Sequence, residues 1–254
     1  MKPRVLSLIA LAAALAAGTA LAAPGENGMR TTFKKGETGW VGRVGPNGTG
    51  ITYVEEKFGS PRPSLRTQYD DFLKNGLRWY NDGHGFTGDY GVVPSFTFGV
   101  DVDTLSLVEG QSQTTRDLMV WFLDYQNPPE GYEAISVGVK IGTLQAGTGW
   151  QHWVATVADT ASTELPEGWI GTGATDPNTG GSILPPGRTF AEVMHHVDEI
   201  AIQTVRQSNI FALDYFDVAI DNPSVIANCP GGAKVRPTAD VPPGAKKGSP
   251  FSPC

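Results

Sequence analysis

The stretch Ser95-Phe96-Thr97-Phe98-Gly99-Val100-Asp101-Val102 alternates between large apolar residues and small or polar ones. Successive side chains of a β-strand point to opposite faces of its sheet. The spacing therefore predicts a strand whose apolar face, made by Phe96, Phe98, Val100 and Val102, lies in a core. The other face then meets solvent, as it does in a two-sheet sandwich.

Other segments repeat this pattern between turn signals, and the 32 glycines and 19 prolines suit many short strands joined by turns. The apolar residues between Thr189 and Val197 instead recur at helical spacing and predict one short amphipathic helix. We therefore predict an all-β sandwich with one short helix. The further predicted strands are Gly50–Lys57, Gly76–Tyr80, Leu118–Tyr125, Ala134–Ile141, Gln151–Val157, Glu199–Val205 and Phe211–Ile220.

The first 23 residues have the pattern of a cleavable secretory signal peptide. Lys2 and Arg4 precede an apolar run that ends near Ala17, and small residues follow up to a predicted cut after Ala22 or Ala23. The run is shorter than the roughly 20 apolar residues that span a bilayer, and no later stretch reaches that length. We expect a secreted or periplasmic protein without a membrane span after cleavage.

The rest of the chain is predicted as one β-sandwich domain, residues 24–228, and a Pro/Gly/Lys-rich C-terminal tail, residues 229–254, outside the core. Residues 171–187 are rich in Gly, Pro, Thr and Asn and predict a long surface loop. The only cysteines, Cys229 and Cys254, both lie in the tail. In an exported protein an even pair predicts a disulfide, here closing a loop of about 25 residues.

The charge balance excludes some partners. The chain carries 19 Lys and Arg residues against 26 Asp and Glu residues, and the predicted signal peptide holds two of the basic ones. An acidic surface without a basic stripe argues against nucleic acid and against anionic membranes. The oligomeric state is left open.

Short motifs in order along the chain resemble a known family. They include Gly39-Trp40, Leu77-Arg78-Trp79-Tyr80, Phe86-Thr87-Gly88-Asp89-Tyr90-Gly91 and the closing Ile220-Asp221-Asn222. Together they are similar to the laminin B module (laminin domain IV), which also occurs in secreted bacterial proteins and is related to galactose-binding-like jelly rolls. The resemblance implies a two-sheet antiparallel sandwich of jelly-roll type. Pro223 and the long 171–187 loop depart from the family pattern, and the cysteine-rich repeats that flank the animal modules are absent.

Aromatic residues are the predicted ligand-binding groups, because their faces stack on sugar rings and on partner chains. Trp79 and Tyr80 are adjacent in a predicted strand, so at least one should face outward. The same holds for Trp150 and Trp153, which are three apart. These four are the predicted contacts. Trp121, Tyr125 and Trp169 remain further candidates.

A glycine-rich turn, residues 81–89, places Asp82 and Asp89 where their carboxylates could hold calcium. Structural calcium is also common in the folds that the resemblance implies. The alternative is an ordinary turn, since Asp and Gly favour turns for backbone reasons. The adjacent His195 and His196 diverge on a helix and suit one metal ion poorly.

Catalysis has weaker support than binding. Asp101 and Asp103 are two apart on a predicted strand and could pair on one face, as a glycosidase requires. Glu-x-Asp-x-x-Glu and Gly-x-Ser-x-Gly motifs are absent. We predict a secreted non-catalytic binding or structural module that recognises a glycan or an extracellular protein. The alternative is a secreted glycan-active hydrolase that uses a carboxylate pair.

Overall fold

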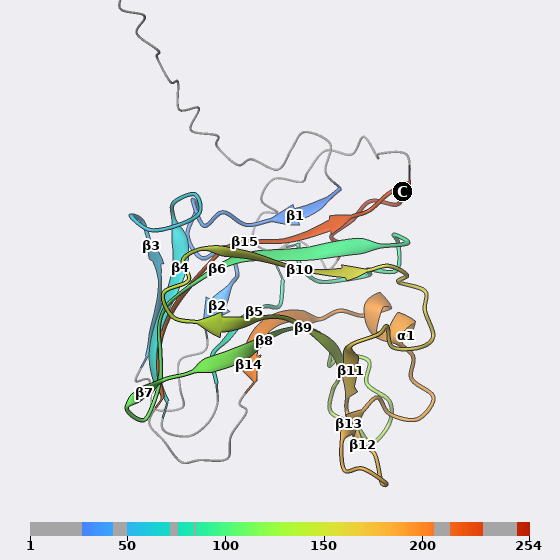
Figure 1. Ribbon diagram of the computed structural model, residues 1–254. Coiled ribbons are helices and arrows are strands. Elements are labelled where there is room, and N and C mark those ends of the chain that lie inside the picture. Colours follow the sequence, from blue (N-terminus) through green and yellow to red (C-terminus); the bar gives the residue numbers. More distant parts are fainter. Residues whose placement is uncertain (1–26, 43–49, 72–75, 84, 206–213, 231–247) are drawn as a thin grey trace, which may run out of the picture.

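The computed structural model describes residues 27–42, 50–71, 76–83, 85–205, 214–230 and 248–254, and the predicted signal peptide lies outside them. Two antiparallel sheets pack face to face (Figure 1). The predicted all-β, two-sheet sandwich of jelly-roll type with one short helix is confirmed. No helix in the described ranges is long and apolar enough to cross a membrane.

Sheet A has the strand order β10-β6-β15-β4-β3, and β1 and β7 add to β15 and β6. Its strands are β1 (Gly28–Arg30), β3 (Ile51–Glu55), β4 (Ser64–Asp71), β6 (Phe96–Glu109), β7 (Ser112–Gln113), β10 (Gln151–Val157) and β15 (Asp214–Ala227).

Sheet B has the order β11-β9-β8-β14-β5-β2. Its strands are β2 (Val41–Gly42), β5 (Arg78–Asn81), β8 (Thr115–Asp124), β9 (Ile135–Gln145), β11 (Trp169–Thr172) and β14 (Glu199–Val205). A small hairpin, β12 (Ala174–Thr175) with β13 (Ser182–Ile183), and the helix α1 (Phe190–His195) complete the described elements.

The apolar face predicted for β6 forms the centre of the core. Phe96, Phe98, Val100 and Val102 are each at most 1% exposed. The Phe96 ring lies 5.6 Å from the ring of Phe122 in β8, measured between centroids, so aromatic contacts join the two sheets.

The short strands β1, β2, β7 and β11 were not predicted, and two longer segments also differ from the sequence prediction. The sequence did not predict strand β4, because its residues, SLRTQYDD, include few apolar ones. The inward Thr67 hydroxyl of this strand accepts a hydrogen bond from the Trp79 indole N–H at 2.8 Å. The predicted 171–187 loop contains the hairpin β12–β13 and begins inside β11. There Asp176 accepts hydrogen bonds from the Asn178 N–H and the Thr179 hydroxyl, both at 2.8 Å, and organises the turn.

The C-terminal residues are tied to the sandwich. The predicted disulfide between Cys229 and Cys254 is present. The prediction that the tail lies outside the core is wrong for its end, because Phe251 is only 6% exposed and belongs to the core cluster. Its ring centroid lies 5.2 Å from that of Tyr90. The side chain of Asn27 holds the same segment by bonding both the backbone N–H and the carbonyl of Ser252.

A buried carboxylate sits where β15 bulges, between Asp221 and Ser224. The two oxygens of Asp221 accept the Ser60 N–H at 2.7 Å and the Asn222 N–H at 2.8 Å. Burial, together with the smaller effect of the nearby charge of Asp101, raises the pKa of Asp221 to about 7, although these two hydrogen bonds lower it.

Truncating the buried C-terminal aromatic tests the role of the tail. Phe251→Ala should lower the unfolding free energy of the oxidised protein by about 3 kcal/mol, because it leaves a cavity beside Tyr90. Phe251→Leu is the matched control and should cost less than about 1.5 kcal/mol. Urea unfolding measures both, and a midpoint unchanged in the alanine variant would contradict the packing role.

The pH dependence of stability tests the Asp221 site. The folded-state pKa, about 7, lies above the ordinary value of 3.8, so the folded protein binds the proton more tightly. The contribution of Asp221 to the unfolding free energy is therefore fully present below pH 4, and it is lost as the pH rises from 4 to 7. Asp221→Asn cannot ionise, so its unfolding free energy should rise relative to wild type between pH 4 and pH 7 and then level off. A difference independent of pH would refute the raised pKa.

Candidate functional site

The register of sheet B aligns one residue from each of its six strands in a single row. Ile170 pairs with Gly138, Gly138 with Trp121, Trp121 with Ala201, Ala201 with Tyr80, and Tyr80 with Val41. We call these six residues the transverse row. Every member is apolar or aromatic, and the row crosses the sheet perpendicular to its strands.

The row lies on the outer face of sheet B because its sequence neighbours face the core. Val120 and Phe122 flank Trp121 and have no exposed surface, and Ile200 and Ile202 do the same on β14. Alternation then directs the row outward. Val41 and Ile170 at its ends are 40% and 44% exposed, and Trp121 and Tyr80 are half-buried.

Small residues let the two aromatic rings lie against the sheet. A Cβ on Gly138 would meet the indole of Trp121 at 2.4 Å, so only glycine allows this ring to cover β9. Ala201 separates Trp121 from Tyr80 and is 1% exposed. The row is therefore two aromatic platforms on either side of a small residue.

Charged and polar side chains flank the row. Arg78 donates to the Glu199 carboxylate, and its guanidinium carbon lies 5.1 Å from the centre of the Tyr80 ring. This cation–π contact and ion pair fix the orientation of Tyr80. On β8 and β9, Asp117 pairs with Lys140 at 2.7 Å. The charges beside the row are thus neutralised in pairs.

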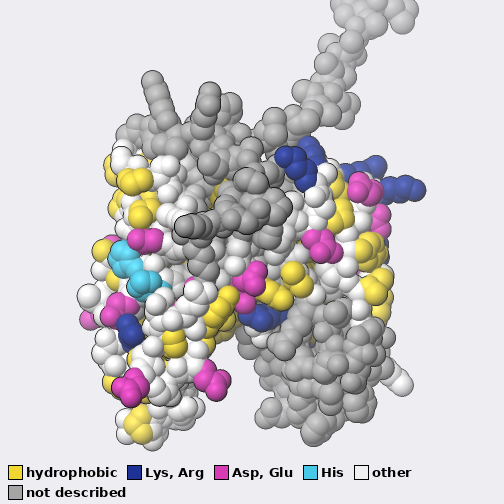
Figure 2. Space-filling view, turned by 180° about the vertical axis from the view of Figure 1, so that it is seen from behind, with side chains coloured by type: hydrophobic (Ala, Val, Ile, Leu, Met, Phe, Trp, Pro, Cys, Tyr) yellow, Lys and Arg dark blue, Asp and Glu magenta, His cyan; other side chains and the backbone are white. Residues whose placement is uncertain are grey.

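Hydroxyl groups lie near the same face. The hydroxyls of Ser136 in β9 and Thr172 in β11 are 2.6 Å apart. Tyr125, directly after β8, is 38% exposed. Burial raises the pKa of the Tyr125 hydroxyl, and the nearby negative charge of Asp82 raises it further. Figure 2 shows hydrophobic side chains beside basic and acidic ones near the centre of the face that it draws.

Of the four predicted aromatic contacts, one belongs to the row. Tyr80 faces outward, whereas Trp79 has no exposed surface and cannot contact a surface ligand. Trp153 packs on the core over Gly142. Trp150 is half-buried against Phe58, with ring centroids 5.3 Å apart.

The sequence identified Trp121 and Tyr125 only as further candidates, and it did not identify Arg78 or Glu199. One signal was available: Arg78 and Tyr80 are two apart in a strand and therefore share a face. Glu199 could not be found, because its contact with Arg78 joins residues 121 positions apart.

The predicted calcium ligands have different surroundings. Asp82 is exposed, whereas Asp89 accepts a hydrogen bond from the Gly91 N–H and lies 2.8 Å from Nδ1 of His195. Within the described part of the chain, no group of three or more His, Cys, Asp or Glu side chains is placed to hold a metal ion. Calcium binding by Asp82 and Asp89 stays a prediction.

Asp101 and Asp103, the carboxylates on which the alternative hydrolase function would depend, lie on the outer face of sheet A. Asp101 lies 2.6 Å from Nδ1 of His152 and accepts a hydrogen bond from Asn222 at 2.7 Å. Asp103 is only 7% exposed, so the two carboxylates do not both face solvent. Burial raises the pKa of Asp103, and the charge of Asp217 adds to the effect.

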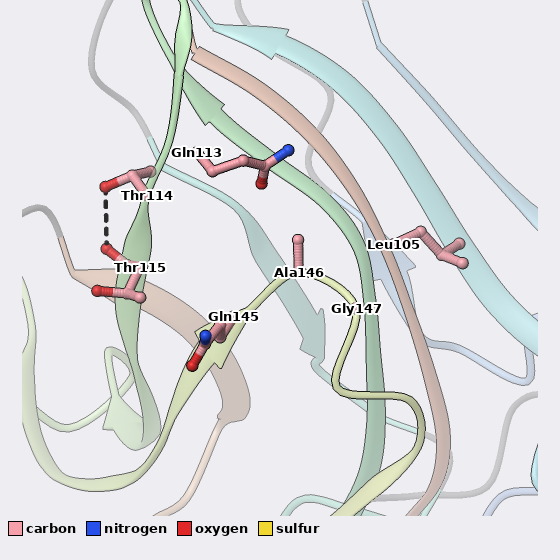
Figure 3. A pocket seen from close by; sticks show the side chains of 7 residues that line it. All are labelled: Leu105, Gln113, Thr114, Thr115, Gln145, Ala146 and Gly147. Carbon is pink, nitrogen blue, oxygen red and sulfur yellow. Dashed lines mark hydrogen bonds between the residues drawn. The ribbon is translucent and has the colours of Figure 1, made fainter.

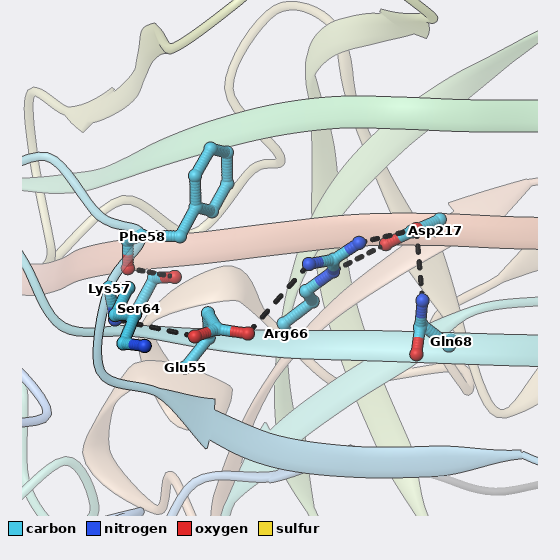
Figure 4. A network of polar contacts seen from close by, with 7 residues as sticks. All are labelled: Glu55, Lys57, Phe58, Ser64, Arg66, Gln68 and Asp217. Atoms are coloured by element: carbon cyan, nitrogen blue, oxygen red, sulfur yellow. Dashed lines mark hydrogen bonds and ion pairs between the residues drawn. The ribbon is translucent and has the colours of Figure 1, made fainter.

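Figure 4 shows how Asp217 itself is held. Arg66 donates two hydrogen bonds of 2.8 Å to its two oxygens, and Gln68 donates a third at 3.1 Å. Glu55 lies 3.8 Å from the same guanidinium group. This carboxylate is fully committed to structural contacts, which leaves it poorly suited to act on a substrate.

No family model and no curated protein matches the chain. Its structural neighbours include the N-terminal tandem CBM22 domain of Paenibacillus barcinonensis Xyn10C, with 11% identity, a TM-score of 0.45, and coverage of 80% of this chain and 50% of that one. This chain thus spans about half of that tandem domain.

Two further neighbours are covered almost completely. The family 11 carbohydrate-binding module of Clostridium thermocellum, solved with a β-1,3-1,4-mixed-linked tetrasaccharide, has 13% identity and a TM-score of 0.42, with 81% and 96% of the two chains covered. The L4b domain of human laminin α-2 has 12% identity and a TM-score of 0.38, with 80% and 99% covered. These three neighbours are carbohydrate-binding modules and a laminin domain, and the other neighbours include two agarases and a carbohydrate esterase. Structural similarities this distant do not indicate a function, and the surface of this chain is the remaining source of functional information.

Proposed function

We propose that this protein is a non-catalytic module that binds a glycan across the outer face of sheet B. The observation that carries the proposal is the placement of Trp121 and Tyr80 in one cross-strand row, with only Ala201 between them. At about 4.8 Å per strand, their backbone positions are about 10 Å apart. Two platforms at this spacing suit two non-adjacent rings of an extended chain better than one compact ligand.

The surroundings of the row match the chemistry of a sugar. A pyranose ring has an apolar face of C–H groups, which stacks on an aromatic ring, and a rim of hydroxyls. Arg78 lies beside the Tyr80 platform and has N–H donors in addition to the one that binds Glu199. Because these charges are paired, the site favours an uncharged glycan over a strongly ionic one.

The covalent structure supports an extracytoplasmic setting. The Cys229–Cys254 disulfide is typical of proteins in oxidising compartments. Secretion through the residues 1–23 signal peptide remains part of the proposal. Binding to an extracellular protein is the competing outcome, since exposed aromatics and arginine also favour protein interfaces.

Binding to soluble polysaccharides tests the proposal. The probes are mixed-linkage β-glucan, xylan, galactomannan and agarose, examined by affinity electrophoresis and calorimetry. Trp121→Ala and Tyr80→Ala should each weaken binding at least about tenfold, because each removes one stacking platform. Trp150→Ala is the matched control and should bind as wild type does, because Trp150 lies outside the row.

Two results would reject glycan binding at the row: no polysaccharide binds the wild type, or both row variants bind as tightly as Trp150→Ala. The alternative hydrolase is tested in parallel by assaying reducing-sugar release. Turnover by the wild type that is lost in Asp103→Asn would replace the binding proposal by an enzymatic one.

A further inference from the structure

A pocket of about 600 Å³ opens at one end of the sandwich, away from the transverse row (Figure 3). Its walls come from both sheets and from the turns that join them. Gln113 and Thr114 contribute from β7 and the residue after it, Thr115 from the start of β8, and Gln145 from the end of β9. Sugar-sized ligands suit concave sites of several hundred cubic ångströms.

Backbone hydrogen bonds hold both sides of this pocket. The Thr114 N–H bonds to the Leu107 carbonyl at 3.0 Å as the chain leaves sheet A. On the other side the Gly147 N–H bonds to the Thr104 carbonyl at 3.0 Å. The two turns are therefore both fixed to β6, so the walls are preformed.

A β-bulge supplies the apolar part of the lining. Asp217 pairs with Ser106 and Val218 with Thr104, which leaves Leu105 as the extra residue of β6. Bulges redirect side chains in this way, and Leu105 is 38% exposed although its strand is central. Leu105 is among the residues that line the pocket, and its side chain points away from Gln113 and Ala146 (Figure 3).

The polar part of the lining carries no charge. Gln113 and Gln145 are exposed, and neither side-chain amide has a hydrogen-bond partner among the described residues. Thr115 adds an exposed hydroxyl. Amides and hydroxyls both donate and accept hydrogen bonds, which matches the hydroxyl groups of a neutral sugar.

Strand β8 connects the pocket to the transverse row. Thr115, Asp117, Met119 and Trp121 alternate along one face of β8, and Gln145 and Thr143 pair with Thr115 and Asp117 on β9. Thr115 and Trp121 are six residues apart, or about 20 Å at 3.3 Å per residue. The surface between them is polar, since Thr143 donates to Asp117 at 2.9 Å.

We propose that this pocket is a second subsite for an uncharged sugar unit, and that the ligand is a glycan long enough to reach it from the transverse row. The inference rests on the proposed function at the row. It adds that affinity rises with chain length and that the distal end of the chain is bound by Gln113 and Gln145.

Oligosaccharides of increasing length, cut from the same four polysaccharides, test the inference. Gln113→Ala and Gln145→Ala should weaken the binding of long chains about five- to tenfold, because each removes a hydrogen-bonding amide. Ala146→Trp should do the same by filling the pocket, because Ala146 points toward Gln113 (Figure 3). Disaccharides should bind all three variants as tightly as wild type.

Gln111→Ala is the matched control, because Gln111 is an exposed glutamine in the adjacent turn but does not line the pocket. Thermal melting confirms that each variant is folded. If Trp121→Ala loses binding while all three pocket variants retain wild-type affinity for long chains, the second subsite is refuted and the row stands. If the wild type binds no oligosaccharide of any length, the proposed function fails and the subsite with it.

Discussion

Aromatic packing between the two sheets is the interaction on which the other features depend. Phe96 in β6 and Phe122 in β8 face each other across the core, and Tyr90 contacts both rings at centroid distances of 5.0 and 5.6 Å. Once Phe122 is buried, the alternation of β8 leaves Trp121 on the opposite face. Slipping β8 by one residue would move every one of these side chains to the wrong side. The position of the transverse row therefore follows from the packing of the core.

The two outer faces of the sandwich then differ in what their side chains are free to do. On sheet A, three carboxylates are taken up by contacts within the protein: Asp217 by Arg66, Asp221 by backbone N–H groups, and Asp101 by His152 and Asn222. On sheet B, the apolar members of the transverse row have no such commitments. These three carboxylates are therefore poorly placed to act on a substrate, because catalysis needs carboxylates that remain available.

The C-terminal segment contributes to the same core. Phe251 extends the aromatic cluster, and the disulfide and Asn27 hold its backbone near β1. In Figure 1 the C-terminus and β1 both lie on the sheet A side of the molecule, opposite the transverse row. The described C-terminal residues thus stabilise the sandwich through the core and through β1.

The sequence by itself determined the elements in which local pattern and burial agree. Strands β10 and β14 were predicted with their observed bounds, and the buried face of β6 and the disulfide were also predicted. Strand β4 and the burial of Phe251 were not, because both depend on partners distant in the chain. Only the tertiary structure decided that Tyr80 and Trp121 share one row, since strand register is fixed by pairing between strands. The bulge at Leu105 was likewise invisible to the sequence, because an extra residue in β6 exists only relative to its partner β15.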